Sequence, residues 1–133
     1  MRISSKGRYA VRVLCEIASN KKEYVSASEI ATNQDISVKY LEHILSILLK
    51  SKLIESQMGA GGGYKLTKPT KNYSVAEILS ATGDLVELAP CQEKGYSCNK
   101  KNCPTCDYWF SLAKIINSNL KNVSLADILA KKY

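Results

Sequence analysis

Apolar residues recur with a helical period in the first part of the chain. Over residues 9–19 they stand at intervals of three and four residues, at Val11, Leu14, Cys15 and Ala18. This spacing places them on one stripe and predicts a helix with Cys15 in the core. Ser26 is followed three residues later by Glu29, which is the spacing of a capping box and predicts the start of a second, short helix.

A third helix is predicted to begin after Ser37, whose hydroxyl can cap it, and to run to about Lys52. Its apolar face consists of Leu41, Ile44, Leu45, Leu48 and Leu49. Its opposite face carries side chains that bond outward rather than pack, namely Lys39, Tyr40, Glu42, His43 and Ser46. Two helices joined by a tight turn at 33–35, the second with a polar outer face, form the pattern of a helix-turn-helix.

The next segment predicts a β-hairpin with a glycine-rich tip. Strands are expected over residues 53–56 and 64–67, and Pro69 ends the second because it lacks the amide needed for the ladder. The glycines of 57–63 form a flexible turn, since a phosphate-binding loop would need a helix after it. A hairpin directly after a helix-turn-helix indicates the wing of a winged helix, where bare backbone can approach DNA closely.

The second half of the chain is predicted to contain three more helices. Ser74 can cap a helix over Val75–Ala81 that Gly83 ends, and Ser124 can cap a final one over Leu125–Ala130. From Asp107 to about residue 120 an apolar stripe recurs, made of Trp109, Leu112, Ala113, Ile116 and Leu120. Residues 84–106 have no regular period.

These elements predict a mostly α-helical chain: a winged helix-turn-helix with a two-stranded wing, and a long C-terminal dimerisation helix. The expected parts are a DNA-binding domain over 1–83, a cysteine-rich loop over 84–106, and the dimerisation helix with a short terminal helix over 107–133.

Charge is distributed unevenly along the chain. Residues 1–75 contain 12 Lys or Arg against 6 Asp or Glu, whereas residues 76–133 contain 7 against 6. The positive first half favours association with nucleic acid, although many soluble proteins of similar charge bind none. The sequence has no run of 18 uncharged apolar residues and no leader-like segment, so we expect a soluble, cytoplasmic protein.

Four of the five cysteines fall within sixteen residues, as Cys91-x6-Cys98-x4-Cys103-x2-Cys106. Without a leader segment, this crowding favours a metal centre over a disulfide scaffold. Thiolates at these intervals can converge on one soft ion or cluster. From spacing alone an iron-sulfur cluster and structural zinc are equally supported, and a thiol-disulfide switch is a weaker third interpretation.

The single histidine, His43, has no catalytic constellation around it in the sequence, and we expect no enzyme activity. On the second helix of a helix-turn-helix it can instead donate to a base edge or a phosphate. The C-terminal stripe has little of its own chain left to cover it. A second subunit is therefore expected there, with Trp109, Leu112, Ile116 and Leu120 at the interface, and its two-fold symmetry would suit a pseudo-palindromic DNA site.

Several stretches, taken in order, carry a family resemblance: SSKGRYAV (4–11), SVKYLEHIL (37–45), GAGGGYKL (59–66), SVAEILSATGD (74–84), CQEKGYSC (91–98) and SLADIL (124–129). Together they resemble the IscR-like regulators of the Rrf-two superfamily of winged-helix proteins, across essentially the whole chain. The resemblance implies a transcription regulator, a repressor, that forms a homodimer through crossed C-terminal helices. It also implies an iron-sulfur cluster that sets the DNA affinity.

In IscR-like proteins three cysteines and a histidine hold a 2Fe-2S cluster. Cys91, Cys98 and Cys103 fall at the three cysteine positions, and Cys106 falls at the histidine position. A thiolate there adds negative charge and should lower the reduction potential of the cluster. The cysteine spacing also differs from the IscR pattern by one residue in two loops, which leaves open the 4Fe-4S cluster of nitric-oxide-sensing relatives.

The residues predicted to contact double-stranded DNA are Lys6, Ser37, Lys39, Tyr40, Glu42, His43, Gly61, Gly62 and Lys65. Glu42 can accept from a cytosine amine and repel base acceptors. Met58 stands where the IscR pattern has an arginine that enters the minor groove, so the base preference is expected to differ. Two other interpretations stay open: a regulator of the same fold that senses through zinc, thiol oxidation or a protein partner, and a small redox protein.

Overall fold

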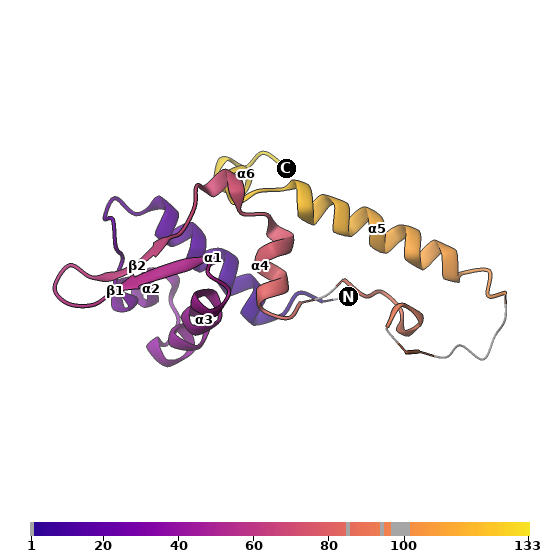
Figure 1. The fold of residues 1–133 in the computed structure, drawn as a ribbon, viewed down its shortest axis with the longest axis horizontal. Helices are drawn as coiled ribbons and strands as arrows, with labels where there is room; N and C mark the ends of the chain where they lie inside the picture. Colours follow the sequence, from indigo (N-terminus) through magenta and orange to yellow (C-terminus); the bar gives the residue numbers. More distant parts are fainter. Residues whose placement is uncertain (1, 85, 94, 97–101) are drawn as a thin grey trace.

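The computed structural model describes residues 2–84, 86–93, 95–96 and 102–133, and Figure 1 shows the course of the chain. Its elements are α1 (Ser5–Ser19), α2 (Ala27–Gln34), α3 (Val38–Lys50), β1 (Ile54–Gln57), β2 (Gly63–Leu66), the 3-10 turn η1 (Thr70–Asn72), α4 (Val75–Ala81), the 3-10 turn η2 (Pro90–Gln92), α5 (Cys106–Asn122) and α6 (Leu125–Ala130). The mostly helical winged-helix fold with a two-stranded wing and a long C-terminal helix is confirmed.

Serine caps fix where the helices begin. Each of four predicted caps accepts a hydrogen bond from the amide three residues on: Ser26 from Glu29, Ser37 from Tyr40, Ser74 from Glu77 and Ser124 from Asp127. A fifth cap corrects the prediction for the first helix, because Ser4 accepts from the Gly7 amide at 3.0 Å and α1 begins at Ser5 instead of residue 9. The first turn of α1 is polar, so it carries no apolar period.

The predicted capping box at the start of α2 is only half formed. Ser26 accepts from the backbone amide of Glu29, but the Glu29 carboxylate does not return to Ser26. It accepts instead from the side-chain amide of Asn20 at 2.9 Å and from the Lys22 ammonium at 2.7 Å. The hydrogen bonds from Lys22 and Asn20 hold the pKa of Glu29 below its usual value. The carboxylate therefore ties α2 to the loop before it.

The core lies where α1, α2, α3 and α4 meet. Its fully buried members include Leu14, Ile30, Leu41, Leu45 and Ile78. Burying an aliphatic side chain of this size contributes about 1.5–3 kcal/mol. Cys15 packs at the edge of this core and is only half-buried, so its predicted place is partly right.

The wing is a hairpin in which β1 and β2 pair antiparallel, with Ile54 opposite Leu66 and Gln57 opposite Gly63. Val25 extends the hairpin by a bridge to Tyr64, with two backbone hydrogen bonds of 2.9 and 2.8 Å. Gly63 has a φ of +145°, and a Cβ there would overlap the carbonyl oxygen of Val25. Only glycine fits where the wing crosses this backbone.

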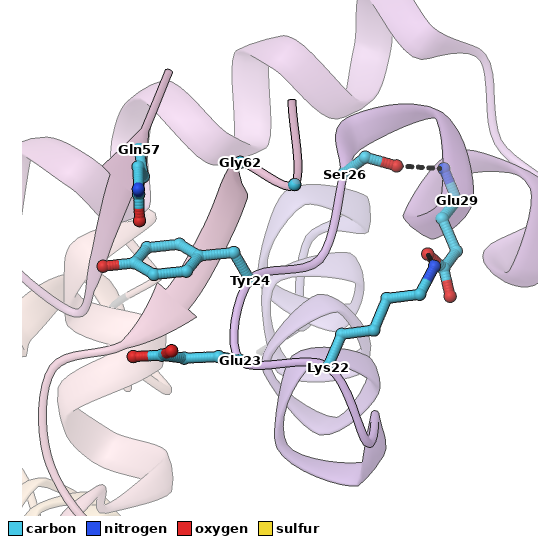
Figure 2. A pocket seen from close by; sticks show the side chains of 8 residues that line it. Lys22, Glu23, Tyr24, Ser26, Glu29, Gln57 and Gly62 are labelled. Atoms are coloured by element: carbon cyan, nitrogen blue, oxygen red, sulfur yellow. Dashed lines mark hydrogen bonds and ion pairs between the residues drawn. The ribbon is translucent and has the colours of Figure 1, made fainter. Parts of the chain in front are cut away.

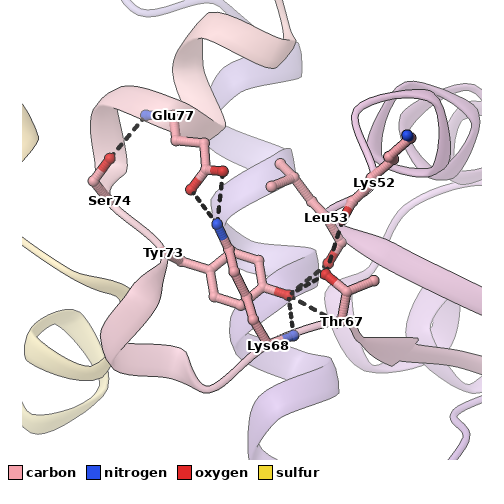
Figure 3. A network of polar contacts seen from close by, with 7 residues as sticks. All are labelled: Lys52, Leu53, Thr67, Lys68, Tyr73, Ser74 and Glu77. Carbon is pink, nitrogen blue, oxygen red and sulfur yellow. Dashed lines mark hydrogen bonds and ion pairs between the residues drawn. The ribbon is translucent and has the colours of Figure 1, made fainter.

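Tyr73 anchors the base of the wing (Figure 3). The ring is fully buried, and its hydroxyl donates to the Leu53 carbonyl at 2.6 Å while it accepts from the Thr67 amide at 2.9 Å. Lys68 lies 4.8 Å from the ring centre and forms an ion pair with Glu77 at 2.7 Å. One side chain thus joins the entry and exit of the hairpin to α4.

The C-terminal part leaves the winged helix as a long helix. α5 packs against α4, and its first turns project away from the body of the molecule (Figure 1). A backbone bridge ties α6 to the chain before α4, through hydrogen bonds from the Val75 amide to Val123 at 3.0 Å and from the Leu125 amide to Tyr73 at 2.9 Å. Within the described residues, no helix is long and apolar enough to cross a bilayer.

Candidate nucleic-acid interface and cysteine centre

The outer face of α3 presents polar side chains from its first two turns. Lys39, Glu42 and His43 are exposed, as is Ser37, which caps the helix. All four predicted contacts stand together because the apolar residues of α3 face the core. An exposed polar face on the second helix of a helix-turn-helix can enter a major groove.

Tyr40 is held differently from its neighbours. It is half-buried, and its ring packs edge-on against Tyr9 of α1, with centroids 5.6 Å apart. The Arg12 guanidinium lies 4.8 Å from the Tyr9 ring centre and donates to the Gln34 carbonyl at 2.9 Å. Tyr9 and Arg12 therefore orient the start of α3, a role that sequence reasoning missed because these contacts are long-range.

The tip of the wing exposes backbone and one large apolar side chain. Gly59 and Gly61 have positive φ angles, and the Gly62 amide donates to the Gly59 carbonyl at 3.0 Å. Met58 is 93% exposed. Gly61 is exposed and Gly62 half-buried, so the predicted glycine contacts lie at an accessible turn.

A cavity of about 490 Å³ lies between the wing and the loop before α2 (Figure 2). The loop contributes Lys22, Glu23 and Tyr24, and the wing contributes Gln57 and its glycines. Within it Lys22 pairs with Glu29, whose amide donates to Ser26, whereas Glu23 and Tyr24 bond to Lys65 and Glu55 outside the lining. We assign it no ligand.

Lys65 is placed differently from the other predicted DNA contacts. Its ammonium forms ion pairs of 3.2 Å with both Glu23 and Glu55, and it lies 4.9 Å from the ring centre of Tyr24. Hydrogen bonds that Lys65 makes with these groups, Glu23 foremost, raise its pKa. The charge of Lys65 is thus compensated within the chain, so the structure offers it less readily to a phosphate than Lys39.

Lys6 stands at the start of α1 and is half-buried. Its charge acts on the carboxylate of Asp84, which accepts hydrogen bonds from Ser4 and Thr82. Lys6 is therefore at the junction between α1 and the end of the winged-helix domain.

Three of the predicted cysteine ligands lie close together at the start of α5. Cys106 is the first residue of the helix, Cys91 lies in η2, and the Cys106 amide donates to the Cys103 carbonyl at 3.3 Å. Desolvation raises the pKa of Cys106, and its charge and hydrogen-bond interactions with Cys91, together with the charge of Cys103, raise it further. Cys98 lies outside the described residues.

The thiols converge without forming a finished metal geometry. Over residues 2–84, 86–93, 95–96 and 102–133, no group of three or more His, Cys, Asp or Glu side chains is arranged to hold a metal ion. The Cys103 sulfur lies 3.3 Å from the Thr105 hydroxyl. The described residues therefore bring Cys91, Cys103 and Cys106 near one another without the geometry of a metal site.

Gln92 fixes the cysteine segment to the long helix. Its side-chain carbonyl accepts from the Leu88 amide at 2.6 Å and the Ala89 amide at 3.2 Å, while its amide donates to the Trp109 carbonyl at 3.1 Å. Cys91 is thereby held beside α5. Sequence reasoning missed Gln92, because a glutamine in a segment without period gives no signal.

The predicted dimerisation stripe lies on one half-buried face of α5, next to more exposed apolar residues. Trp109, Leu112, Ile116 and Leu120 are all half-buried in the single chain. Tyr108 and Ile115 are more open, at 59% and 64% exposed, and with Leu112 they share a face at helical spacing. The structure thus adds Tyr108 and Ile115 to the set available to a partner.

A helix-turn-helix followed by a wing and a long projecting helix defines the class of winged-helix DNA-binding proteins. Residues 3–131 match the model of the Rrf2 family, described as iron-dependent transcriptional regulators, and the chain belongs to that family. It is 36% identical over 130 residues to the transcriptional regulator IscR of Klebsiella pneumoniae, covering 97% of this chain and 80% of that protein.

Two solved structures share the fold. T. potens IscR matches with a TM-score of 0.76 and 28% identity, covering 100% of this chain and 89% of that one. CymR of B. subtilis, described as its global cysteine regulator, matches with a TM-score of 0.84 and 23% identity, covering 98% of each chain. The family match and the curated relative show that the chain is a DNA-binding transcription regulator and not an enzyme.

Proposed function

We propose that this chain binds operator DNA as a homodimer and represses transcription, and that an iron-sulfur cluster held by Cys91, Cys98, Cys103 and Cys106 sets its DNA affinity. One observation carries the proposal: Cys91 and Cys103 approach Cys106 at the start of α5. The description of the family as iron-dependent supports it.

The residues present fit such a group. Thiolates are the usual ligands of iron-sulfur clusters, and four stand in one short segment. Cys106 sits at the N-terminus of α5, where the helix dipole favours an anionic sulfur. Desolvation and the neighbouring thiols oppose a Cys106 thiolate, and a bound cation would offset this opposition. When bound, the cluster supplies redox-active iron that can also be lost as iron supply falls.

The DNA-reading part follows from the α3 face. In this proposal the exposed Lys39 contacts a phosphate, whereas the exposed Glu42 and His43 contact base edges. The exposed wing tip around Gly61 would lie against the neighbouring backbone or minor groove. A dimer formed through α5 would present two such units to a pseudo-palindromic site.

A second candidate keeps the fold and the DNA binding but replaces the cluster by zinc or by thiol oxidation. The interaction of Cys91 with Cys106 favours it equally, since zinc also takes four thiolates and adjacent thiols can oxidise to a disulfide. The similarity to CymR shows only the shared fold.

An anaerobic preparation separates the two candidates. We expect iron and acid-labile sulfide in comparable amounts and a brown protein. Iron and sulfide should be lost in Cys106→Ala and Cys98→Ala. They should be kept in Cys15→Ala, because Cys15 packs at the edge of the core and is far in sequence from the other cysteines. A colourless protein that contains zinc, or no metal, would contradict the cluster and leave the second candidate.

A further inference from the structure

A single carboxylate closes the winged helix where the cysteine segment begins. Asp84 accepts from the Ser4 amide at 3.0 Å, from the Ser4 hydroxyl at 2.8 Å and from the Thr82 hydroxyl at 2.8 Å. It thereby joins the start of α1 to the end of α4. We refer to Asp84 with its partners Ser4 and Thr82 as the Asp84 latch.

The latch acts on the cap of α1 itself. The Ser4 hydroxyl that donates to Asp84 is also the acceptor for the Gly7 amide at 3.0 Å. α1 approaches the carboxylate so closely that a Cβ on Gly7 would overlap the Asp84 side chain and touch Leu79. A shift of Asp84 therefore has to move the first turn of α1 or release its cap.

Basic side chains surround this first turn. Arg2 and Arg8 are exposed and line a cavity of about 690 Å³ with Ser4 and Ser5, and Lys6 acts on the Asp84 carboxylate. Such a cluster at a helix N-terminus favours an anion such as a DNA phosphate. The latch thus determines where these charges stand.

The segment after the latch is anchored again beside the cysteines. We refer to residues 86–93 as the strap. Near its far end Gln92 holds the Leu88 and Ala89 amides and the Trp109 carbonyl of α5, and its neighbour Cys91 interacts electrostatically with Cys106. The strap therefore runs between the cysteine centre at one end and α1 at the other.

We propose that Asp84 is a positioning residue that transmits the state of the cysteine centre to the DNA-contacting start of α1. When the cysteines change their arrangement, the Gln92 anchor moves the strap, and the latch sets the cap of α1 and the basic side chains next to it. This inference rests on the proposed function, because it needs a cysteine centre with two states. Coupling of this kind requires two discrete arrangements that both sites bias.

The test compares cluster-loaded and cluster-free protein on one duplex, enriched from a random-sequence pool by the loaded wild type. The variant Asp84→Asn keeps the shape but replaces the oxygen that accepts from Ser4 and Thr82 by a donor. Glu87→Gln, at an exposed position of the strap, removes the same charge as a matched control. Thr82→Val removes one latch hydrogen bond and serves if Asp84→Asn folds poorly.

In Asp84→Asn we expect iron and sulfide contents equal to the wild type and a loaded-to-free affinity ratio within about twofold of one. Thr82→Val should move the ratio in the same direction, and Glu87→Gln should leave it unchanged. Amide exchange supplies a readout without DNA: protection of the Gly7 amide should depend on cluster state in the wild type but not in Asp84→Asn.

Two results would overturn the inference in distinguishable ways. If the wild-type loaded-to-free affinity ratio differs clearly from one, and Asp84→Asn keeps that ratio and only lowers the melting temperature, Asp84 is merely structural. A wild-type ratio of one would contradict cluster control itself, and the inference would fail with the proposed function.

Discussion

Replacing Lys39 by alanine tests the assignment of α3 as the helix that meets DNA. Lys39 is exposed in the first turn of α3. For B-DNA the slope of log affinity against log salt concentration changes by about 0.9 for each phosphate contact. Lys39→Ala removes one contact from each subunit of a two-fold dimer, so the magnitude of the slope should fall by about 1.8. Between roughly 50 and 200 mM salt, the affinity deficit of Lys39→Ala should then shrink about twelvefold.

Lys65→Ala and Lys121→Ala provide the comparison. The Lys65 ammonium is already paired at 3.2 Å with Glu23 and with Glu55, so its removal should change the slope by less than half as much. Lys121 is exposed near the end of α5, outside the helix-turn-helix and the wing, and its loss should leave the slope unchanged. All three variants remove one positive charge per chain.

The assay is a salt series of equilibrium titrations by fluorescence anisotropy, on one labelled duplex for all proteins. Equal slopes for wild type and Lys39→Ala would refute a phosphate contact. A larger slope change for Lys65→Ala than for Lys39→Ala would refute the argument from ion pairing.

Three further predictions concern stability. Tyr73→Phe removes the hydroxyl bound to the buried Leu53 carbonyl, so denaturant unfolding should show a loss of about 1–3 kcal/mol, and an unchanged midpoint would contradict the anchor. Gly63→Ala should cost about 2 kcal/mol or more in the same assay, since a Cβ overlaps the Val25 carbonyl at a φ of +145°; a neutral effect would contradict that crossing. Burial raises the pKa of Asp84, but the hydrogen bonds it accepts lower it more, so the latch stabilises the fold above the usual pKa and this stability is lost as pH falls through the lowered pKa. In Asp84→Asn the free energy of unfolding should therefore fall less steeply with decreasing pH than in the wild type. Parallel curves of unfolding free energy against pH would argue against the latch.

Local signals were sufficient for most of the fold. Ser74 and Ser124 predicted the helices Val75–Ala81 and Leu125–Ala130 to the residue, because an N-cap acts within one turn. The wing strands were predicted within one residue, since alternation and the glycine tip both lie inside the hairpin. The start of α1 was missed, because its first turn is polar and carries no apolar period.

The candidate site was less accessible to sequence reasoning. The positions on α3 follow from helical period, and exposure of Lys39, Glu42 and His43 agrees with them. The pairing of Lys65 with two carboxylates, like the clamp formed by Gln92, depends on contacts between distant segments that no period reveals. Likewise, the apolar period of α5 does not predict which of its residues pack against α4.

The central claim is that the cysteine centre controls DNA affinity, and titration of one duplex with cluster-loaded and cluster-free wild type tests it most directly. Both forms should come from one anaerobic preparation, with iron and sulfide measured on each. The two affinities should differ by about fivefold or more, and the difference should be absent in Cys106→Ala. Equal affinities of a demonstrably loaded and a demonstrably empty protein would contradict it.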